Sequence, residues 1–127
     1  MTSTHDLTTL AARILISSLF IVFGFEKITG YSSSVGYMES YGLPGVLLPL
    51  AIAAELGGGL AILLGVYARW AALALAAFCI VTALVFHTAW AGEGGQGQFI
   101  NFMKNLALAG GLLLLYANGP GKYAVKD

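Results

Sequence analysis

Four long apolar stretches, separated by short polar or glycine-rich breaks, fill most of the chain. We place them at residues 7–29, 44–67, 68–91 and 99–118. Each is close to the roughly 20 apolar residues that a membrane-spanning helix needs. The apolar runs are unbroken and show no period-two alternation, so we expect no strands. The pattern predicts an all-α membrane protein, with residues 1–127 forming a single antiparallel four-helix transmembrane bundle.

The breaks between the stretches predict how the helices connect. Between the first two stretches Val35, Met38 and Tyr41 recur at helical spacing, which predicts a short interfacial helix with tyrosines at headgroup level. A tight turn near Arg69 makes the second and third stretches neighbours, and a flexible glycine-rich loop at residues 92–97 precedes the fourth. With four spans, both termini are expected on one side of the membrane.

The distribution of basic residues predicts an orientation. The side of the termini carries Arg13, Arg69, Lys122 and Lys126, whereas the other side carries Lys27 and Lys104. Because Lys and Arg are enriched in cytoplasmic segments, we expect cytoplasmic termini in a multi-pass protein of the bacterial inner (cytoplasmic) membrane. Arg13 leans toward the termini and is expected to snorkel to that surface. The first stretch exceeds the roughly 7–15-residue apolar region of a signal peptide, so we expect a retained anchor.

Composition narrows the class of protein. Charged residues make up 9 % of the chain, against about 25 % in soluble domains. Basic and acidic residues are equal in number, so no overall field attracts nucleic acid. Cys79 is the single cysteine, which excludes an internal disulfide or a thiolate cluster and predicts a small buried thiol. The bilayer itself is the expected partner.

Small residues recur at four-residue spacing in the second stretch, at Ala53, Gly57, Ala61 and Gly65. Such a ridge lets helix backbones approach one another closely. We therefore expect the second helix to lie centrally and to pack through this ridge. The glycines at positions 57, 58 and 59 do not predict a phosphate-binding loop, because they lack the strand-to-helix turn and the GK[ST] motif.

Polar side chains inside or near the ends of the apolar stretches carry the functional signal. They are Lys27, Glu55, His87, Lys104 and Asn105, called here the polar set. A charge at bilayer depth costs about 2.5–3.5 kcal/mol or more, so such residues usually face a protein interior. Glu55 lies roughly 16 Å below Pro44, near the bilayer midplane. Because Cβ atoms tilt toward the helix N-terminus, the set is expected to converge in the outer half of the bundle.

Each member of the polar set also has a structural interpretation. Glu55 could be a neutral acid or could pair with Lys27 or Lys104, and Lys27 could instead snorkel, with Glu26 at the interface. His87 could be a hydrogen-bonded core histidine, and Lys104 and Asn105 could line a wet loop entrance. Glu55 and His87 are the candidate catalytic residues. No metal or haem site is predicted, because His87 has no second histidine within the membrane.

Short segments spread over the chain resemble one protein family. They are residues 23–30 (FGFEKITG), 37–44 (YMESYGLP), 55–59 (ELGGG), 65–69 (GVYAR) and 104–111 (KNLALAGG). In order and spacing they resemble the DoxX family of small four-helix bacterial inner-membrane proteins. The resemblance implies an oxidoreductase component, since relatives are linked to thiosulfate:quinone oxidoreduction and to quinone or catechol stress. It carries no established catalytic assignment for any residue.

Three classes of function remain open. The first is an integral component of a quinone-linked redox system, in which the polar set binds a quinone head group and a protein partner in a membrane redox complex exchanges the electrons. Phe20, Phe86 and Trp90 would supply apolar walls. The second is a non-enzymatic assembly or accessory subunit. A small transporter is a third interpretation, but four short spans leave room for a pore only in a homo-oligomer.

Overall fold

The computed structural model describes residues 2–126. Its helices are α1 (Thr2–Thr29), α2 (Tyr31–Ser40), α3 (Leu48–Ile52), α4 (Gly58–Leu64), α5 (Ala68–Phe86) and α6 (Gly95–Asn118). A 3-10 turn, η1 (Gly45–Leu47), precedes α3, and a π-helical turn, η2 (Ala53–Gly57), joins α3 to α4. The elements from η1 to α4 therefore form one continuous span.

Four segments are long and apolar enough to cross a membrane. They are Thr4–Thr29, Gly45–Leu64, Ala68–Phe86 and Gly95–Asn118. The predicted all-α, four-helix transmembrane fold is confirmed. A short helix, α2, is also present where the sequence predicted one.

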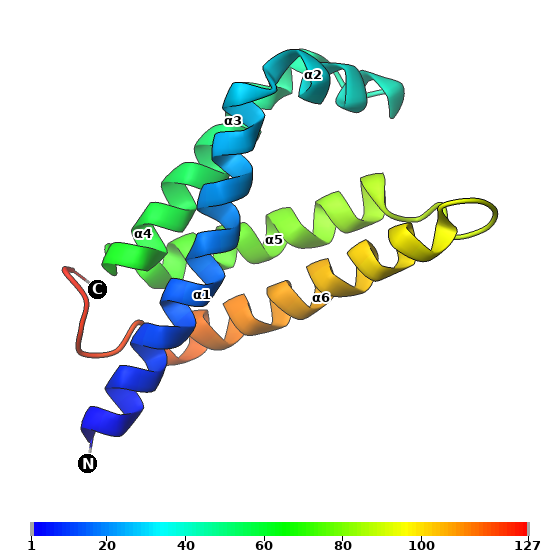
Figure 1. Ribbon diagram of the computed structural model, residues 1–127. Coiled ribbons are helices and arrows are strands. Elements are labelled where there is room, and N and C mark those ends of the chain that lie inside the picture. The colour runs from blue at the N-terminus through cyan, green and yellow to red at the C-terminus, as the bar shows by residue number, and fades with distance from the viewer. Residues whose placement is uncertain (1, 127) are drawn as a thin grey trace.

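The spans form two pairs that diverge like the arms of a V (Figure 1). In one arm α1 packs along the second span, and in the other α5 packs along α6. The arms meet at the end of the molecule that holds the termini. At the open end, α2 extends from the first arm above the end of α5 (Figure 1). The bundle is thus closed at one end and splayed at the other.

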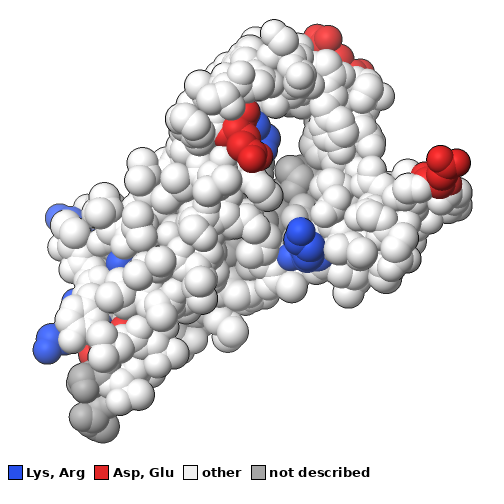
Figure 2. All heavy atoms as spheres, in the orientation of Figure 1, with Lys and Arg blue, Asp and Glu red and all other residues white. Residues whose placement is uncertain are grey.

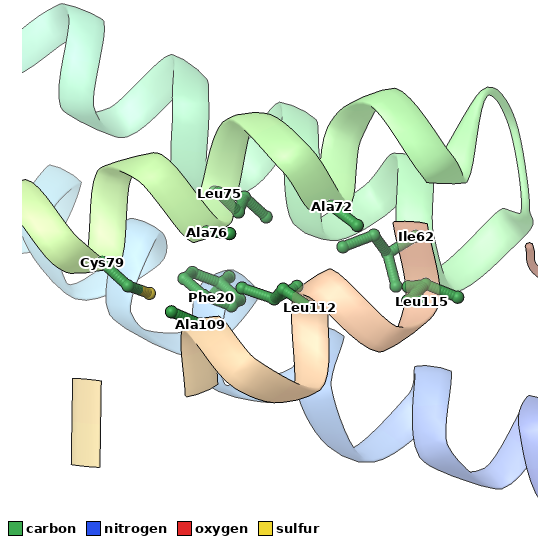
Figure 3. Close-up of a cluster of buried hydrophobic side chains, with 9 residues drawn as sticks. All are labelled: Phe20, Ile62, Ala72, Leu75, Ala76, Cys79, Ala109, Leu112 and Leu115. Carbon is green, nitrogen blue, oxygen red and sulfur yellow. The ribbon is translucent and has the colours of Figure 1, made fainter. Parts of the chain in front are cut away.

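A core of buried apolar side chains joins the arms where they cross. Its members are Phe20, Ile62, Ala72, Leu75, Ala76, Cys79, Ala109, Leu112 and Leu115 (Figure 3). Phe20 of α1 points toward the side chains of α5 and α6 (Figure 3). Cys79 is buried here, as expected. Because lipid tails are as apolar as these side chains, close van der Waals contact supplies most of the stabilisation.

The second span packs closely at Gly58 and Gly59 and not at Gly57, so the predicted ridge is wrong at Gly57. A Cβ at Gly58 would lie 2.8 Å from Leu75 Cδ1, and one at Gly59 would lie 3.0 Å from Ile21 Cγ1. At Gly57 a Cβ would meet no atom within 4 Å. The π-helical turn explains the difference, because its wider turn shifts every following residue to another face.

Helix α5 ends at Phe86, before the predicted end at residue 91. The Trp90 indole N–H donates to the His87 carbonyl at 2.7 Å, and Gly92 has a φ of +84°. This left-handed residue and the side-chain bond hold the segment as a turn. His87 therefore lies just beyond the span, and α6 begins at Gly95, earlier than predicted.

Arg13 is buried, and the prediction that it snorkels is wrong. Its side chain donates to the carbonyls of Ile62 (2.9 Å), Leu63 (2.8 Å), Pro120 (3.1 Å) and Tyr123 (2.6 Å). The first two carbonyls belong to the last turn of α4, which has no intrahelical partners for them and carries the negative end of the helix dipole. Arg13 thereby joins α1, α4 and the C-terminal tail.

Further backbone hydrogen bonds fasten the tail. Val66 and Lys126 form a parallel bridge, in which the Tyr67 N–H donates to the Lys126 carbonyl at 2.7 Å. The Lys122 N–H donates to Asp6 Oδ1 at 3.2 Å. Residues 119–126 are therefore part of the folded domain.

Candidate functional site

A cleft of about 1060 Å³ opens between the two arms. Side chains from α1, α2, the second span, α5 and α6 line it. Figure 2 shows the hollow, with basic and acidic side chains together on one rim and a further basic side chain on the opposite rim. The volume is at the upper end of the range for small-molecule sites, about 300–1,000 Å³.

All five members of the polar set line this cleft. They come from four places in the chain: Lys27 from α1, Glu55 from η2, His87 from the end of α5, and Lys104 and Asn105 from α6. The convergence expected from helix directions is therefore found.

Lys27 and Glu55 form an ion pair at one wall of the cleft. Lys27 Nζ lies 2.8 Å from Glu55 Oε1. The side chain of Glu55 is 5 % exposed and that of Lys27 is 31 % exposed, so the carboxylate is much the more deeply enclosed. Glu55 sits in the middle of the π-helical turn, a distortion that often marks functional positions. The pairing agrees with one of the two alternatives for Glu55 and excludes simple snorkelling of Lys27.

Lys104 lies on α6 and lines the cleft without a counter-ion. Among residues 2–126, no hydrogen bond or ion pair involves its side chain. A cation inside a membrane span is costly unless a polar group accompanies it. Lys104 is therefore the cleft's available donor for an acceptor from outside the chain.

Asn105 is anchored across the helix pair. Its Nδ2 donates to Thr82 Oγ1 on α5 at 3.0 Å. The bond is half-buried and fixes the amide at the edge of the cleft. It uses one of the two N–H groups of the amide and leaves the other N–H and the oxygen for further hydrogen bonds. Asn105 thus has both an architectural contact and spare hydrogen-bonding capacity.

His87 is held by Gln98 at the open end. Its Nδ1 lies 2.8 Å from Gln98 Oε1, and the Gln98 amide donates to the Tyr41 hydroxyl at 3.4 Å. Because the amide oxygen can only accept, Nδ1 carries the proton in this bond. In the neutral form of the ring, Nε2 is then the hydrogen-bond acceptor. His87 is thereby oriented as a group that can take a proton.

Helix α2 forms a roof over the cleft through aromatic contacts. The ring of Tyr37 stacks on Phe86 with centroids 5.3 Å apart, and Tyr41 meets the same ring edge-on at 5.0 Å. Burial, together with the adjacent Tyr41, raises the pKa of Tyr37 to about 12. Tyr37 is therefore a neutral phenol over the physiological pH range.

The remaining walls are apolar. Phe20 and Phe86 line the cleft as expected, together with Phe23 and Phe78. Trp90 does not line it, contrary to expectation, because the turn after Phe86 carries its ring onto Phe99 and Phe102 at centroid distances of 5.3 and 5.1 Å. The site combines aromatic walls with a few placed polar groups.

Sequence reasoning missed several polar contributors. Thr82 and Gln98 orient Asn105 and His87, and Glu26 lines the cleft although it is exposed. A threonine in an apolar helix is too common to be informative. Gln98 was expected on one α6 stripe with Asn101 and Asn105, but that spacing did not indicate its bond to His87. No sequence signal marks the π-helical turn.

Comparison with known proteins agrees with this architecture. The DoxX family model matches residues 8–88, which include most of the first span and all of the second and third. The chain belongs to the DoxX family. This match covers Lys27, Glu55 and His87, whereas Lys104 and Asn105 lie beyond it.

Two relatives extend the similarity over nearly the whole chain. Inner membrane protein YqjF of Escherichia coli K12 is 49 % identical over 125 residues, covering 98 % of this chain and 94 % of its own length. Inner membrane protein YphA of the same strain is 37 % identical over 116 residues, covering 88 % of this chain and 83 % of its own. No solved structure matches significantly. This DoxX protein is a multi-pass inner-membrane protein.

Proposed function

We propose that this DoxX protein is an integral component of a quinone-linked redox system and binds a quinone head group in the cleft. One observation carries the proposal: Lys104, a cation without a partner among residues 2–126, lines the same aromatic-walled cleft as the Lys27–Glu55 pair and His87. An aromatic head group with two carbonyl oxygens matches such a combination of flat apolar walls and separated polar groups.

The chain's own side chains support this ligand class at both ends. Lys104 and the free N–H of Asn105 are donors that suit a carbonyl oxygen. Glu55 on the first arm and the Nε2 of His87 at the end of α5 are acceptors that can hold a proton at a defined atom. A bound quinone would itself supply the two-electron chemistry. The protein positions donors and acceptors around it.

The electrons require a second component. Cys79 is the single cysteine, so it cannot form an internal disulfide couple. We propose that a partner in a membrane redox complex exchanges electrons with the ligand. The splayed open end of the V is the side from which the cleft is reachable.

The test is quinone binding to purified protein in lipid nanodiscs. Glu55→Gln, His87→Ala and Lys104→Met should each weaken binding about tenfold, the effect of losing one hydrogen bond to a charged or charge-bearing group. Lys122→Met is the matched control, because Lys122 is exposed in the tail and does not line the cleft.

Equal affinity in all variants, with thermal unfolding unchanged, would remove these residues from a ligand site. The alternative of a non-enzymatic assembly or accessory subunit would then lead. Co-purification of a larger complex that survives all three substitutions would support that alternative.

A further inference from the structure

A second, apolar groove lies between α1 and α6 and meets the cleft. It has a volume of about 330 Å³ and is lined by Ile16, Leu19, Lys104, Ala107, Leu108 and Gly111. The α6 residues follow the spacing of one helix face, so the groove runs along α6 for about 10 Å, at 1.5 Å per residue. Lys104 is its polar end, and the rest of its lining is apolar or lacks a side chain.

The groove and the cleft are adjacent and share part of their lining. Leu19, Lys104 and Leu108 line both of them. Lys104 therefore stands at the junction, with the polar cleft on one side and the apolar groove on the other. A molecule with a polar head and an apolar chain could occupy both spaces at once and place its head beside Lys104.

Small residues keep the groove open. Gly111 has no side chain, and a Cβ there would already meet Ile16 Cδ1 at 3.7 Å. Ala107 adds only a methyl group. The axes of α1 and α6 also diverge from their crossing point near the termini (Figure 1). Because the groove lies within membrane spans and is apolar, a hydrocarbon chain fits it better than water.

We propose that this groove binds the isoprenoid tail of the ligand whose head group occupies the cleft. The proposal rests on the proposed function and specifies it: the substrate class becomes tailed, membrane-soluble quinones, not free small quinones. Lys104 lines both spaces, so one molecule with a head group and a tail can fill them together. A separate lipid whose acyl chain lay in the groove would bring a second head group to Lys104, where it would compete with the quinone head group.

The experiment compares two quinones with the same head group, one without a tail and one with a short isoprenoid tail. Their dissociation constants are measured in nanodiscs for the wild type, Gly111→Leu and Ala107→Leu. Both substitutions fill the groove and leave the polar set intact. Gly110→Leu is the matched control, because a side chain at Gly110 meets open space and lines neither the groove nor the cleft. Thermal unfolding confirms that each variant is folded.

We expect the groove-filling substitutions to weaken binding of the tailed quinone about fivefold, the scale of losing part of one buried apolar chain, and to leave the tail-less quinone unaffected. Unchanged affinity for the tailed quinone in both folded variants would overturn the groove assignment while the proposed function stands. An equal loss in Gly110→Leu would also overturn it, because the effect would not be local. Failure of both quinones to bind the wild type would overturn the proposed function, and the groove assignment with it.

Discussion

Lys27 Nζ and Glu55 Oε1 lie 2.8 Å apart, yet the two side chains are unequally protected from the surroundings. Glu55 has 5 % of its side-chain surface exposed, whereas Lys27 has 31 %. The carboxylate therefore depends on its partner more than the ammonium does, because a buried charge without a partner is strongly unfavourable. This asymmetry predicts that removing the charge of Lys27 destabilises the protein more than removing the charge of Glu55.

Lys27→Met should lower the free energy of unfolding by about 3 kcal/mol, since it leaves a buried carboxylate unpaired. Adding Glu55→Gln in the double variant should restore most of this loss, because the remaining amide carries no charge. Glu55→Ala should cost more than Glu55→Gln, which retains shape and hydrogen bonding. Unfolding by denaturant in detergent micelles measures all four variants.

The neighbouring Glu26→Gln is the control for the ion pair. Glu26 is exposed, so its substitution should change stability by no more than about 0.5 kcal/mol. A double variant as unstable as Lys27→Met alone would contradict the pairing.

Arg13→Met should destabilise the protein by about 3 kcal/mol or more, because four backbone carbonyls lose their buried donor. Arg13→Lys keeps the charge but cannot reach all four acceptors, so its cost should be intermediate. The C-terminal tail should also become cleavable by carboxypeptidase. Lys122→Met, which leaves the backbone bonds intact, should show neither effect. A tail that stays protected from carboxypeptidase in Arg13→Met would show that the hydrogen bonds of Arg13 do not hold it in place.

The roof helix α2 should respond to alkaline pH. The folded-state pKa of Tyr37 is raised to about 12 from an ordinary value of 10.0, so the folded protein holds this proton more tightly than the unfolded chain. The contribution of Tyr37 to stability is therefore complete below pH 10 and is lost as the pH rises toward about 12. Tyrosinate absorbance should show one late-titrating tyrosine that Tyr37→Phe removes.

Phe86→Ala should bring that titration back toward the ordinary value, because Phe86 covers the Tyr37 ring. It should also speed hydrogen exchange in α2. Phe99→Ala, which removes a ring that contacts Trp90 instead, should change neither measurement. Slow exchange in α2 without Phe86 would show that other contacts hold the roof.

Cysteine labelling should establish the orientation. In a Cys79→Ala background, cysteines at Ser33 and Glu93 should react with an impermeant maleimide from outside, and one at Lys126 should not. Both outer positions are exposed, and Glu93 avoids the left-handed backbone of Gly94. The reverse pattern would place the termini outside, against the distribution of Lys and Arg.

The sequence predicted the number of spans and the residues that meet in the cleft. Hydrophobic length determines the first, and helix direction combined with a fixed rise per residue largely determines the second. Lys27 and Glu55 form the expected pair, because an error of a few residues in a helix boundary changes neither the direction of the helix nor the approximate depth of a side chain. His87 also reached the cleft, although α5 ends earlier than predicted.

The wrong predictions involve backbone hydrogen-bond acceptors and a helix distortion, neither of which can be recognised from the pattern of side chains. Arg13 was expected at the surface because its partners are backbone carbonyls from residues 62–63 and 120–123, and a carbonyl looks the same in every residue. The ridge that includes Gly57 assumed an unbroken α-helix, and the π-helical turn broke its register. The divergence of the two arms was not predicted either, because it depends on contacts between helices and not on the sequence of any one apolar stretch.

The hydrogen bonds of the buried Arg13 side chain have a consequence for biogenesis. Arg13 enters the membrane with the first span, but two of its four acceptors, Pro120 and Tyr123, follow the fourth span and are synthesised after it. Until α6 and the segment after it have emerged, the first helix carries an arginine that lacks half of its hydrogen-bond acceptors. Truncation directly after α6 would therefore leave an incompletely paired arginine inside the first span.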